Sequence, residues 1–437
     1  MRILLLNTSF PPQLRSAARL FHELGADLVK RGHQVTVITE FPWRRLGGDT
    51  NHAAVPETEC DHGMEVKRVR VPCYAENSII GRGINLLLLP WLFYRAARSM
   101  GAQELTVVYS PPLTLGLAAW LLKRRTGAAF ILNVQDIYPQ TAIDLGYLRN
   151  RFLIRAFQWL ERFLYRHADC VVVHSEGNRR YLTSRDRVQP ERAIAIPNWV
   201  DTGRIRPGSR SNEFRARHHI AEQFVVCYAG TMGYAQDLTP ILAAARALAG
   251  RPDILFLLVG EGVQAPRWRQ MAEGLSNVRF LPLLGEADYA GLIDACDAGF
   301  VPLAEELRTP VVPAKLLDFM AAARPVIATL NPASDAAAII TAAECGFVFS
   351  PHESAGVAQA IVFLRENPDA CRARGSSGRR YAEQAFSLHV CAGQYEALFR
   401  QVLRGDANQP ASQAVNDPSN NRAGERVKRA VSSERLP

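Results

Sequence analysis

The sequence lacks several patterns that mark common classes of protein. Its eight cysteines include no C-x-x-C pair and no cysteine and histidine cluster at zinc spacing, which argues against a disulfide framework and against a zinc finger. We therefore expect reduced thiols in a cytoplasmic protein. The apolar run at residues 3–6 is too short for a signal peptide, and the longer run at residues 84–94 is too short to cross a bilayer.

Positive charge is in excess in this sequence. The formal net charge of +9 favours an anionic partner, which leaves nucleic acid, an acidic membrane surface and a phosphorylated substrate. The sequence contains no zinc-finger, RRM or basic-zipper pattern, so nucleic acid is the least supported of the three and we expect none. A chain of 437 residues with 48% hydrophobic content is typical of a globular protein with two cores.

Strands and helices alternate along most of the chain. The apolar run at 2–6, the helical pattern at 16–30 and the β-branched run at 34–39 predict a parallel βαβ unit. A second series begins at the strand 224–229, after a polar run that reads as a linker. The pattern predicts an α/β fold of two Rossmann-like domains facing a cleft. The expected parts are an N-terminal domain (1–201), a linker (202–212), a C-terminal domain (213–380), a C-terminal helix that could return to the N-terminal domain (381–404) and a disordered tail (405–437).

The stretch 308–330 is the most informative part of the sequence. It predicts a Pro-rich loop, a helix that begins near Pro313 and a buried strand at 326–329. Lys315 falls in the first helical turn, where the helix dipole favours an anion, so a phosphate would satisfy both the free amides and the lysine. Asp318 lies three residues later on the same helix face. The alternative interpretation is an exposed Lys-Asp pair of little energetic value.

Other polar or glycine-rich segments follow strands, where parallel sheets place their ligands. Gly230 and Gly233 follow one strand and can let the backbone approach a diphosphate. Gly260 and Glu261 follow the next strand. In the N-terminal half the strand 129–134 ends in Gln135 and Asp136; a helix cap is the alternative role for Asp136.

The segment PAKLLDFMAA at 313–322, followed by RPVI at 324–327, resembles the donor-binding motif of family 4 glycosyltransferases, in the branch that builds bacterial exopolysaccharide and O-antigen units. That motif has the form P-S-K-x-x-E-Y-M-A-x-G-x-P-V-I. Asp318 stands at the second of the two acidic positions of the family and Pro310 at the first, while Gln135 stands where the family often has a histidine. The resemblance implies donor-binding roles for Gly230, Thr231, Gly233, Gly260, Glu261, Arg308, Lys315, Leu316 and Asp318, catalytic roles for Asp136 and Gln135, and an acceptor side at Arg15 and Ser16.

The resemblance also implies a reaction on a GT-B fold. A sugar would move, with retention of configuration, from a nucleoside diphosphate, expected to be UDP, to a polyprenyl-diphosphate-linked acceptor. The sequence contains no D-x-D, so we expect no metal and no cofactor, with Lys315 stabilising the leaving diphosphate. Two alternatives stay open: a non-hydrolysing UDP-sugar epimerase, and a catalytically silent scaffold that binds sugar nucleotides or membranes.

Two segments bear on membrane binding. Residues 84–94 are apolar and aromatic, and residues 151–166 are amphipathic, aromatic and basic, with arginines at 151, 155, 162 and 166. They could lie in a membrane interface, or they could pack inside the N-terminal domain. Because the implied acceptor is a lipid, we expect a cytoplasmic protein bound peripherally to the inner face of the plasma membrane.

Overall fold

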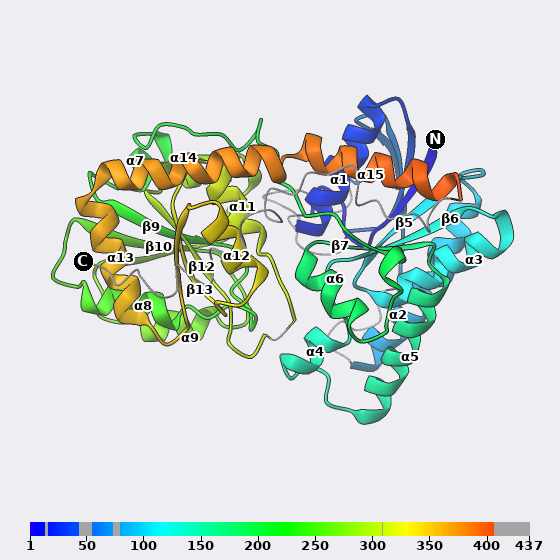
Figure 1. The fold of residues 1–437 in the computed structure, drawn as a ribbon, viewed down its shortest axis with the longest axis horizontal. Coiled ribbons are helices and arrows are strands. Elements are labelled where there is room, and N and C mark those ends of the chain that lie inside the picture. Colours follow the sequence, from blue (N-terminus) through cyan, green and yellow to red (C-terminus); the bar gives the residue numbers. More distant parts are fainter. Residues whose placement is uncertain (14–15, 43–54, 73–78, 308, 406–437) are drawn as a thin grey trace.

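The computed structural model describes residues 1–13, 16–42, 55–72, 79–307 and 309–405. Two α/β units lie side by side, each built on its own sheet (Figure 1). This confirms the predicted class of two Rossmann-like domains. The predicted tail lies almost entirely outside the described residues.

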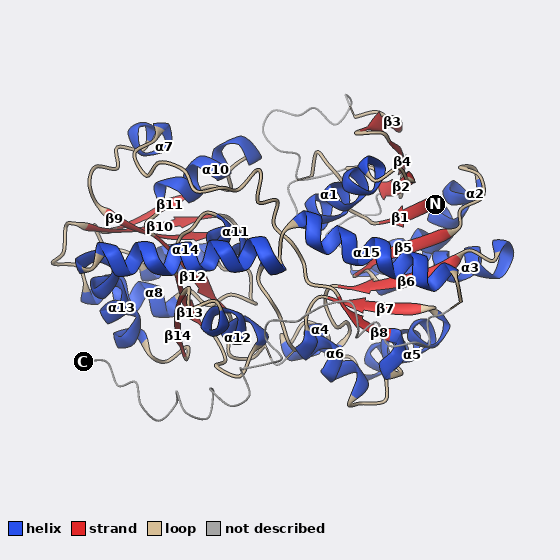
Figure 2. Ribbon diagram, turned by 45° about the horizontal axis from the view of Figure 1, so that its top comes forward, coloured by secondary structure: helices blue, strands red, loops and turns tan. Residues whose placement is uncertain are grey.

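The N-terminal unit holds a sheet of eight strands in the order β3-β4-β2-β1-β5-β6-β7-β8 (Figure 2). Every neighbouring pair is parallel except β3 and β4. The strands are β1 (Arg2–Leu6), β2 (Gln34–Glu40), β3 (Thr58–Asp61), β4 (Met64–Val69), β5 (Leu105–Ser110), β6 (Ala129–Val134), β7 (Cys170–Val173) and β8 (Ala193–Ala195). The helices are α1 (Ser16–Lys30), α2 (Ile79–Arg98), α3 (Gly116–Thr126), α4 (Gln140–Asp144), α5 (Arg151–His167) and α6 (Glu176–Thr183).

Burial on both faces explains why these strands are continuously apolar. One face of the N-terminal sheet packs on α2, α3 and α5. The other packs on α1 and on the last helix, α15 (Leu388–Leu403), whose Tyr395 and Phe399 enter that core. Helix α15 therefore returns to the first domain.

The C-terminal unit holds a parallel sheet of six strands in the order β11-β10-β9-β12-β13-β14. The strands are β9 (Phe224–Ala229), β10 (Ile254–Val259), β11 (Val278–Leu281), β12 (Ala298–Pro302), β13 (Val326–Thr329) and β14 (Gly346–Phe349). The helices are α7 (Glu213–Arg217), α8 (Thr239–Ala247), α9 (Ala265–Met271), α10 (Glu286–Ala295), α11 (Ala314–Ala321), α12 (Asp335–Ala342), α13 (Ser354–Glu366) and α14 (Pro368–Ala385). Apolar clusters cover both faces of this sheet as well.

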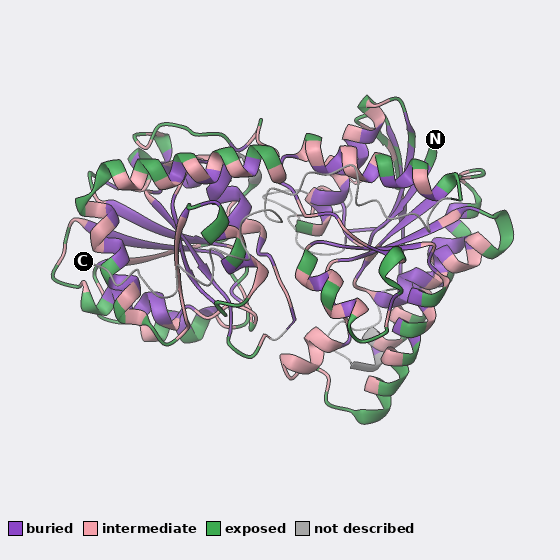
Figure 3. Ribbon diagram, viewed as in Figure 1, coloured by how far each residue is buried: buried purple, intermediate pink, exposed green. Residues whose placement is uncertain are grey.

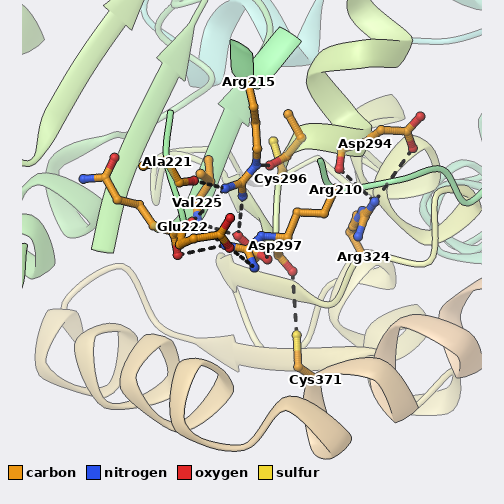
Figure 4. Close-up of polar contacts among 12 residues, drawn as sticks. Arg210, Arg215, Ala221, Glu222, Val225, Asp294, Cys296, Asp297, Arg324 and Cys371 are labelled. Atoms are coloured by element: carbon orange, nitrogen blue, oxygen red, sulfur yellow. Dashed lines mark hydrogen bonds and ion pairs between the residues drawn. The ribbon is translucent and has the colours of Figure 1, made fainter. Parts of the chain in front are cut away.

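An ion-pair cluster ties the linker to the amino ends of the C-terminal strands (Figure 4). Asp297, directly before β12, forms an ion pair with Arg210, whose Nε lies 2.9 Å away, and accepts a hydrogen bond from Arg215 Nη2 at 2.8 Å. It also accepts from the amide of Val225 in β9 at 2.8 Å. Its oxygens are thus engaged within the domain, at the end of the sheet opposite to the ligand-binding end. The cluster anchors the linker to the C-terminal domain.

Two segments differ from the sequence predictions. The polar and turn-rich stretch 41–64 predicts a surface loop, but residues 58–61 form β3, which pairs with β4 across a hairpin; residues 43–54 lie outside the described part. No helix was predicted for the residues of α14, which forms although it contains two glycines. A Cβ on Gly375 would lie 2.0 Å from the carbonyl oxygen of Ala323, so the glycine permits close packing that outweighs its poor helix propensity.

Two further observations concern the cysteines and the length of the helices. All seven cysteines in the described residues are free thiols, as expected. Among the described helices, none has the length and apolar character needed to span a bilayer.

Candidate functional site

The loops after the strands of both sheets meet between the domains. A cavity of about 300 Å³ lies there, lined from the N-terminal domain by Asp144 and Leu145 and from the C-terminal domain by residues that include Tyr234 and Gln236. The hydroxyls of Thr141 and Thr309 lie 3.2 Å apart across the same junction. The two domains therefore contact one another along this junction, and the cavity lies beside the predicted site residues without being lined by any of them.

Lys315 is the second residue of α11 and reaches toward the loop after β9. A Cβ built on Gly230 would lie 3.2 Å from Lys315 Cε, and the Lys315 ammonium lies 4.9 Å from the centre of the Tyr228 ring. Burial lowers the pKa of Lys315 to about 8, an effect that Asp318 partly opposes. In the part of the chain that the structure describes, Lys315 forms no ion pair. This geometry does not fit the alternative of an exposed Lys-Asp pair.

The glycines in the loops after β9 and β10 allow close backbone packing and also leave space for a neighbouring side chain. Gly230 and Gly260 have φ values of 145° and 143°, which only glycine adopts freely. A Cβ on Gly260 would lie 1.9 Å from the carbonyl oxygen of Gly230, and one on Gly262 would lie 2.2 Å from that of Met232. The tips of β9 and β10 thus lie backbone against backbone. Gly230 additionally leaves the room into which Lys315 extends.

Asp318 joins the two domains. Its carboxylate accepts from Arg19 Nη1 of α1 at 3.2 Å and from Tyr289 Oη of α10 at 2.8 Å. Asp318 is 3% exposed, and its attraction raises the pKa of Arg19. Burial and Asp318 together raise the pKa of Tyr289. A carboxylate has about four acceptor positions, so these two bonds leave room for a ribose hydroxyl only at its remaining lone pairs.

A second carboxylate continues this contact toward the linker. Glu23 lies one turn after Arg19 on α1 and accepts from Trp199 Nε1 at 2.9 Å. It also lies 3.5 Å from Arg204 Nη2. Burial raises the pKa of Glu23, although the nearby charges of Arg19 and Arg204 oppose this rise. The α1 helix is therefore held between the linker and the helix that carries Lys315.

Gln135 is fixed by hydrogen bonds within its own domain. Its side-chain amide exchanges two bonds with Asn198, at 2.7 and 3.0 Å, and donates to Asn133 Oδ1 at 2.8 Å. Asn133 in turn donates to the hydroxyl of Tyr395 at 2.6 Å. A polar chain thus runs from α15 to the tip of β6 and orients Gln135.

Asp136 has a different environment. Its side chain is exposed to solvent, yet the protein around it raises the pKa of its carboxyl group by desolvation. No side chain caps α4, whose preceding residue is Pro139, so the alternative role as a helix cap is not seen. Within the described residues its carboxylate accepts no hydrogen bond and is free to face a ligand.

The other predicted residues lie at loop tips, at the start of α1, in the C-terminal core or outside the described part of the chain. Thr231 and Glu261 are exposed at the loop tips, and Gly233 donates its amide to Gln236 at 3.4 Å. Ser16 is exposed at the first position of α1. The side chain of Leu316 is fully buried in the C-terminal core, and its amide donates to the carbonyl oxygen of Pro313. Arg15 and Arg308 lie outside the described residues.

Sequence reasoning missed Arg19, Tyr289 and Tyr228. A weak signal existed for Arg19, since it lies one helical turn before Glu23 and close to the loop after β1. Tyr289 and Tyr228 lie in apolar surroundings, so nothing in the sequence separates them from core residues.

Comparisons with known proteins agree with this arrangement. Residues 17–199 match the family described as glycosyl transferase 4-like domain, and residues 223–367 match glycosyl transferases group 1. WbjE of Pseudomonas aeruginosa, described as a glycosyltransferase, is 23% identical over 76% of this chain and 84% of its own. WcaI of Escherichia coli, described as a colanic acid biosynthesis glycosyl transferase, is 23% identical over 74% of this chain and 81% of its own.

The fold has solved counterparts. The crystal structure of HepE from Anabaena in complex with UDP superposes with a TM-score of 0.67, at 16% identity over 92% of this chain and 100% of that one. At this level of identity the likeness concerns the fold, which is two parallel-sheet α/β domains.

Proposed function

Because the chain belongs to the group 1 glycosyltransferases and has their two-domain GT-B fold, we propose that it transfers a sugar from UDP to a lipid-linked saccharide during the synthesis of a surface polysaccharide. Relatives named for colanic acid and O-antigen synthesis support the pathway class. The UDP bound to HepE supports the choice of nucleotide. Retention of configuration is part of the proposal and rests on the family resemblance.

One observation carries the donor assignment. Lys315 lies at the amino end of α11 with no ion pair among the described residues, beside a loop whose glycine leaves room for its side chain. A cation with a pKa of about 8 is mostly protonated at neutral pH. An anion of the donor would relieve the cost of burying that charge, and a diphosphate also accepts from the free amides of the first helical turn.

The chemistry follows from this placement. As the sugar leaves, negative charge develops on the diphosphate and positive charge on the anomeric carbon. Lys315 stabilises the diphosphate, and Asp136, a free carboxylate on the opposite side of the cleft, stabilises the positive carbon or accepts the proton of the acceptor hydroxyl. The raised pKa of Asp136 suits proton transfer better than an ordinary aspartate would. Gln135 orients the sugar as a hydrogen-bonding amide.

An activity assay tests this function. The purified protein is incubated with a panel of UDP-sugars and with a membrane lipid extract, and the products are separated by chromatography and mass spectrometry. We expect a sugar to appear on an extracted lipid. Conversion of one UDP-sugar into another would instead support an epimerase, and binding without turnover would support a scaffold.

The acceptor proposal includes the membrane surface. Helix α2 buries Leu89 and Phe93 but leaves Leu87 78% and Trp91 52% exposed, so it is neither fully packed nor fully free. Helix α5 likewise exposes apolar side chains near its start, and much of its ribbon has the green of exposed residues in Figure 3. The exposed apolar residues of these helices are Ile84, Leu87, Trp91, Phe152, Leu153 and Trp159.

Basic residues accompany this apolar surface. Arg151, Arg155, Arg162 and Arg166 are all exposed on α5. Each basic residue near an anionic membrane contributes about 1 kcal/mol, so four together support reversible binding. The described chain has no helix that spans a bilayer, and we propose that the N-terminal domain binds the surface instead.

Liposome sedimentation tests the membrane proposal. We expect binding to anionic vesicles that weakens as salt rises, because salt screens the charges. Binding should also weaken when the four α5 arginines are changed to Gln. A matched control removes the same charge from exposed positions of the C-terminal domain and should bind normally: Arg246, Arg267, Arg269 and Arg372. Equal loss in both variants, or no binding at low salt, would contradict the proposal and favour a soluble acceptor.

A further inference from the structure

A cluster of two histidines and an aspartate lies outside the cleft, between α1 and the β3–β4 hairpin. His22 Nε2 lies 2.9 Å from Asp61 Oδ2, and His62 Nδ1 lies 2.7 Å from Asp61 Oδ1. The three potential donor atoms all lie within 4.8 Å of one another. The two imidazole rings meet edge to face with centroids 5.0 Å apart. Three side chains of the metal-binding type therefore converge on one point.

The backbone that carries these side chains is fixed independently of any ion. His62 and Gly63 form the two-residue hairpin turn with φ values of 50° and 81°, which matches a type I′ turn. A Cβ on Gly63 would lie 2.8 Å from Val29 of α1, so the turn packs directly on that helix. His22 is held from its own side by an edge contact with the buried Phe10 ring at 5.4 Å.

The donor set defines the kind of ion. Two imidazoles and one carboxylate are borderline ligands that suit zinc and its first-row neighbours better than magnesium or calcium. The side chain of His62 is 61% exposed, whereas those of His22 and Asp61 are 21% and 25% exposed. The cluster is thus open to solvent on one side, where water would complete the coordination of the ion.

We propose that His22, Asp61 and His62 bind one divalent transition-metal ion, with zinc as the probe. The ion would join α1 to the edge hairpin beside the loop that follows β1. That loop carries Phe10, and Arg68 of β4 donates to the carbonyl oxygen of Pro11 at 3.0 Å. The ion would brace the N-terminal wall of the cleft. It is distinct from the diphosphate site, for which the sequence predicts no metal, and it does not depend on the proposed transfer reaction.

Calorimetric titration of the metal-free full chain with zinc tests the site. We expect one ion per chain, and a loss of affinity of at least about tenfold in His62→Asn, since even outer partners of a metal site cost that much when removed. Asparagine tolerates a positive φ, so this variant removes the imidazole while keeping the turn. The matched control is His219→Asn, because His219 is exposed and also has a positive φ of 51° but lies away from the cluster.

Two further measurements separate zinc binding by the histidines from binding by the nearby thiol and from a loss of folding. Cys60 is an exposed thiol next to Asp61, so Cys60→Ser should leave zinc affinity unchanged if the histidines bind the ion. Zinc should raise the melting temperature of the wild type but not that of His62→Asn, whose circular dichroism and UDP affinity should be normal. Absence of zinc binding by the wild type overturns the proposal, as does equal affinity in His62→Asn or loss of binding in Cys60→Ser.

Discussion

The two walls of the cleft are built on different principles. On the N-terminal wall, Gln135 is held by Asn198, Asn133 and, through Asn133, by Tyr395. On the C-terminal wall, Lys315 has an aromatic ring and a glycine for neighbours and, among the described residues, no ion pair. Gln135 is thus satisfied before any ligand arrives, while Lys315 carries a charge that a ligand can satisfy.

This difference assigns the walls their tasks. A group that must keep one geometry during sugar transfer benefits from fixed hydrogen bonds, because reorganisation during the reaction is costly. A group that must capture an anion benefits from being unpaired, because no partner has to be displaced. Asp318 and Arg19 connect the walls, so in the proposed mechanism a donor bound at Lys315 and the fixed amide of Gln135 would be held in one frame.

The largest effect is expected from Asp136→Asn, which removes the free charge from the N-terminal wall. We expect kcat to fall by about a hundredfold or more, the usual cost of losing a group that transfers a proton or stabilises charge. Donor affinity should be unchanged. Steady-state kinetics with the identified acceptor measure this, and a variant with normal kcat would reduce Asp136 to a loop residue.

The next largest effect is expected from Lys315→Ala on the C-terminal wall. The loss of UDP-sugar affinity should be about 1.5 to 3 kcal/mol, typical of a hydrogen bond to a charged group. The exposed Lys30 at the end of α1 provides the control, and Lys30→Ala should bind normally. Calorimetry decides between the outcomes: an unchanged affinity would show that the buried cation has no donor role.

A double-mutant cycle tests the connection between the walls. Arg19→Gln and Asp318→Asn should each lower kcat/KM, acting mainly on the KM for the donor. The two losses should overlap, with an interaction energy of about 1 to 3 kcal/mol, because each removes the same contact. Simple additivity would mean that Arg19 and Asp318 act separately.

The smallest effect is expected from Tyr395→Phe, which removes the acceptor for the buried Asn133 amide. We expect a destabilisation of about 1 kcal/mol, the net value of one hydrogen bond, and a modest fall in kcat through Gln135. Thermal melting and kinetics measure both. A fully normal variant would show that α15 does not support the N-terminal wall through this hydrogen bond.

The sequence predicted the fold well because its strands are buried on both faces and read as continuous apolar runs. The helix start at Pro313 and the strand at 326–329 were also predicted correctly, since proline and β-branched residues act locally. Helix α14 was missed because its glycines are explained only by tertiary packing, in which Gly375 faces the carbonyl oxygen of Ala323 and Gly378 faces the side chain of Cys345.

The site was predictable only where local pattern carries the chemistry. Lys315 could be singled out because its place in a helical turn is a local property. Its pairing state, and the contact between Arg19 and Asp318, depend on how two domains meet, which no spacing in the chain encodes. Leu316 looked similar to its neighbours in the motif, yet its helix position turns it into the core.

We propose that the Lys315 ammonium binds the donor diphosphate, and the pH dependence of UDP-glucose affinity tests this proposal. In the ligand-free protein the pKa of Lys315 is about 8, and binding of an anionic donor favours the charged form of this lysine. Affinity should therefore hold near pH 7 and fall by up to about tenfold per pH unit above about pH 8. In Lys315→Arg, which stays charged, the fall should vanish. A flat profile in the wild type, or the same fall in both proteins, would contradict the claim.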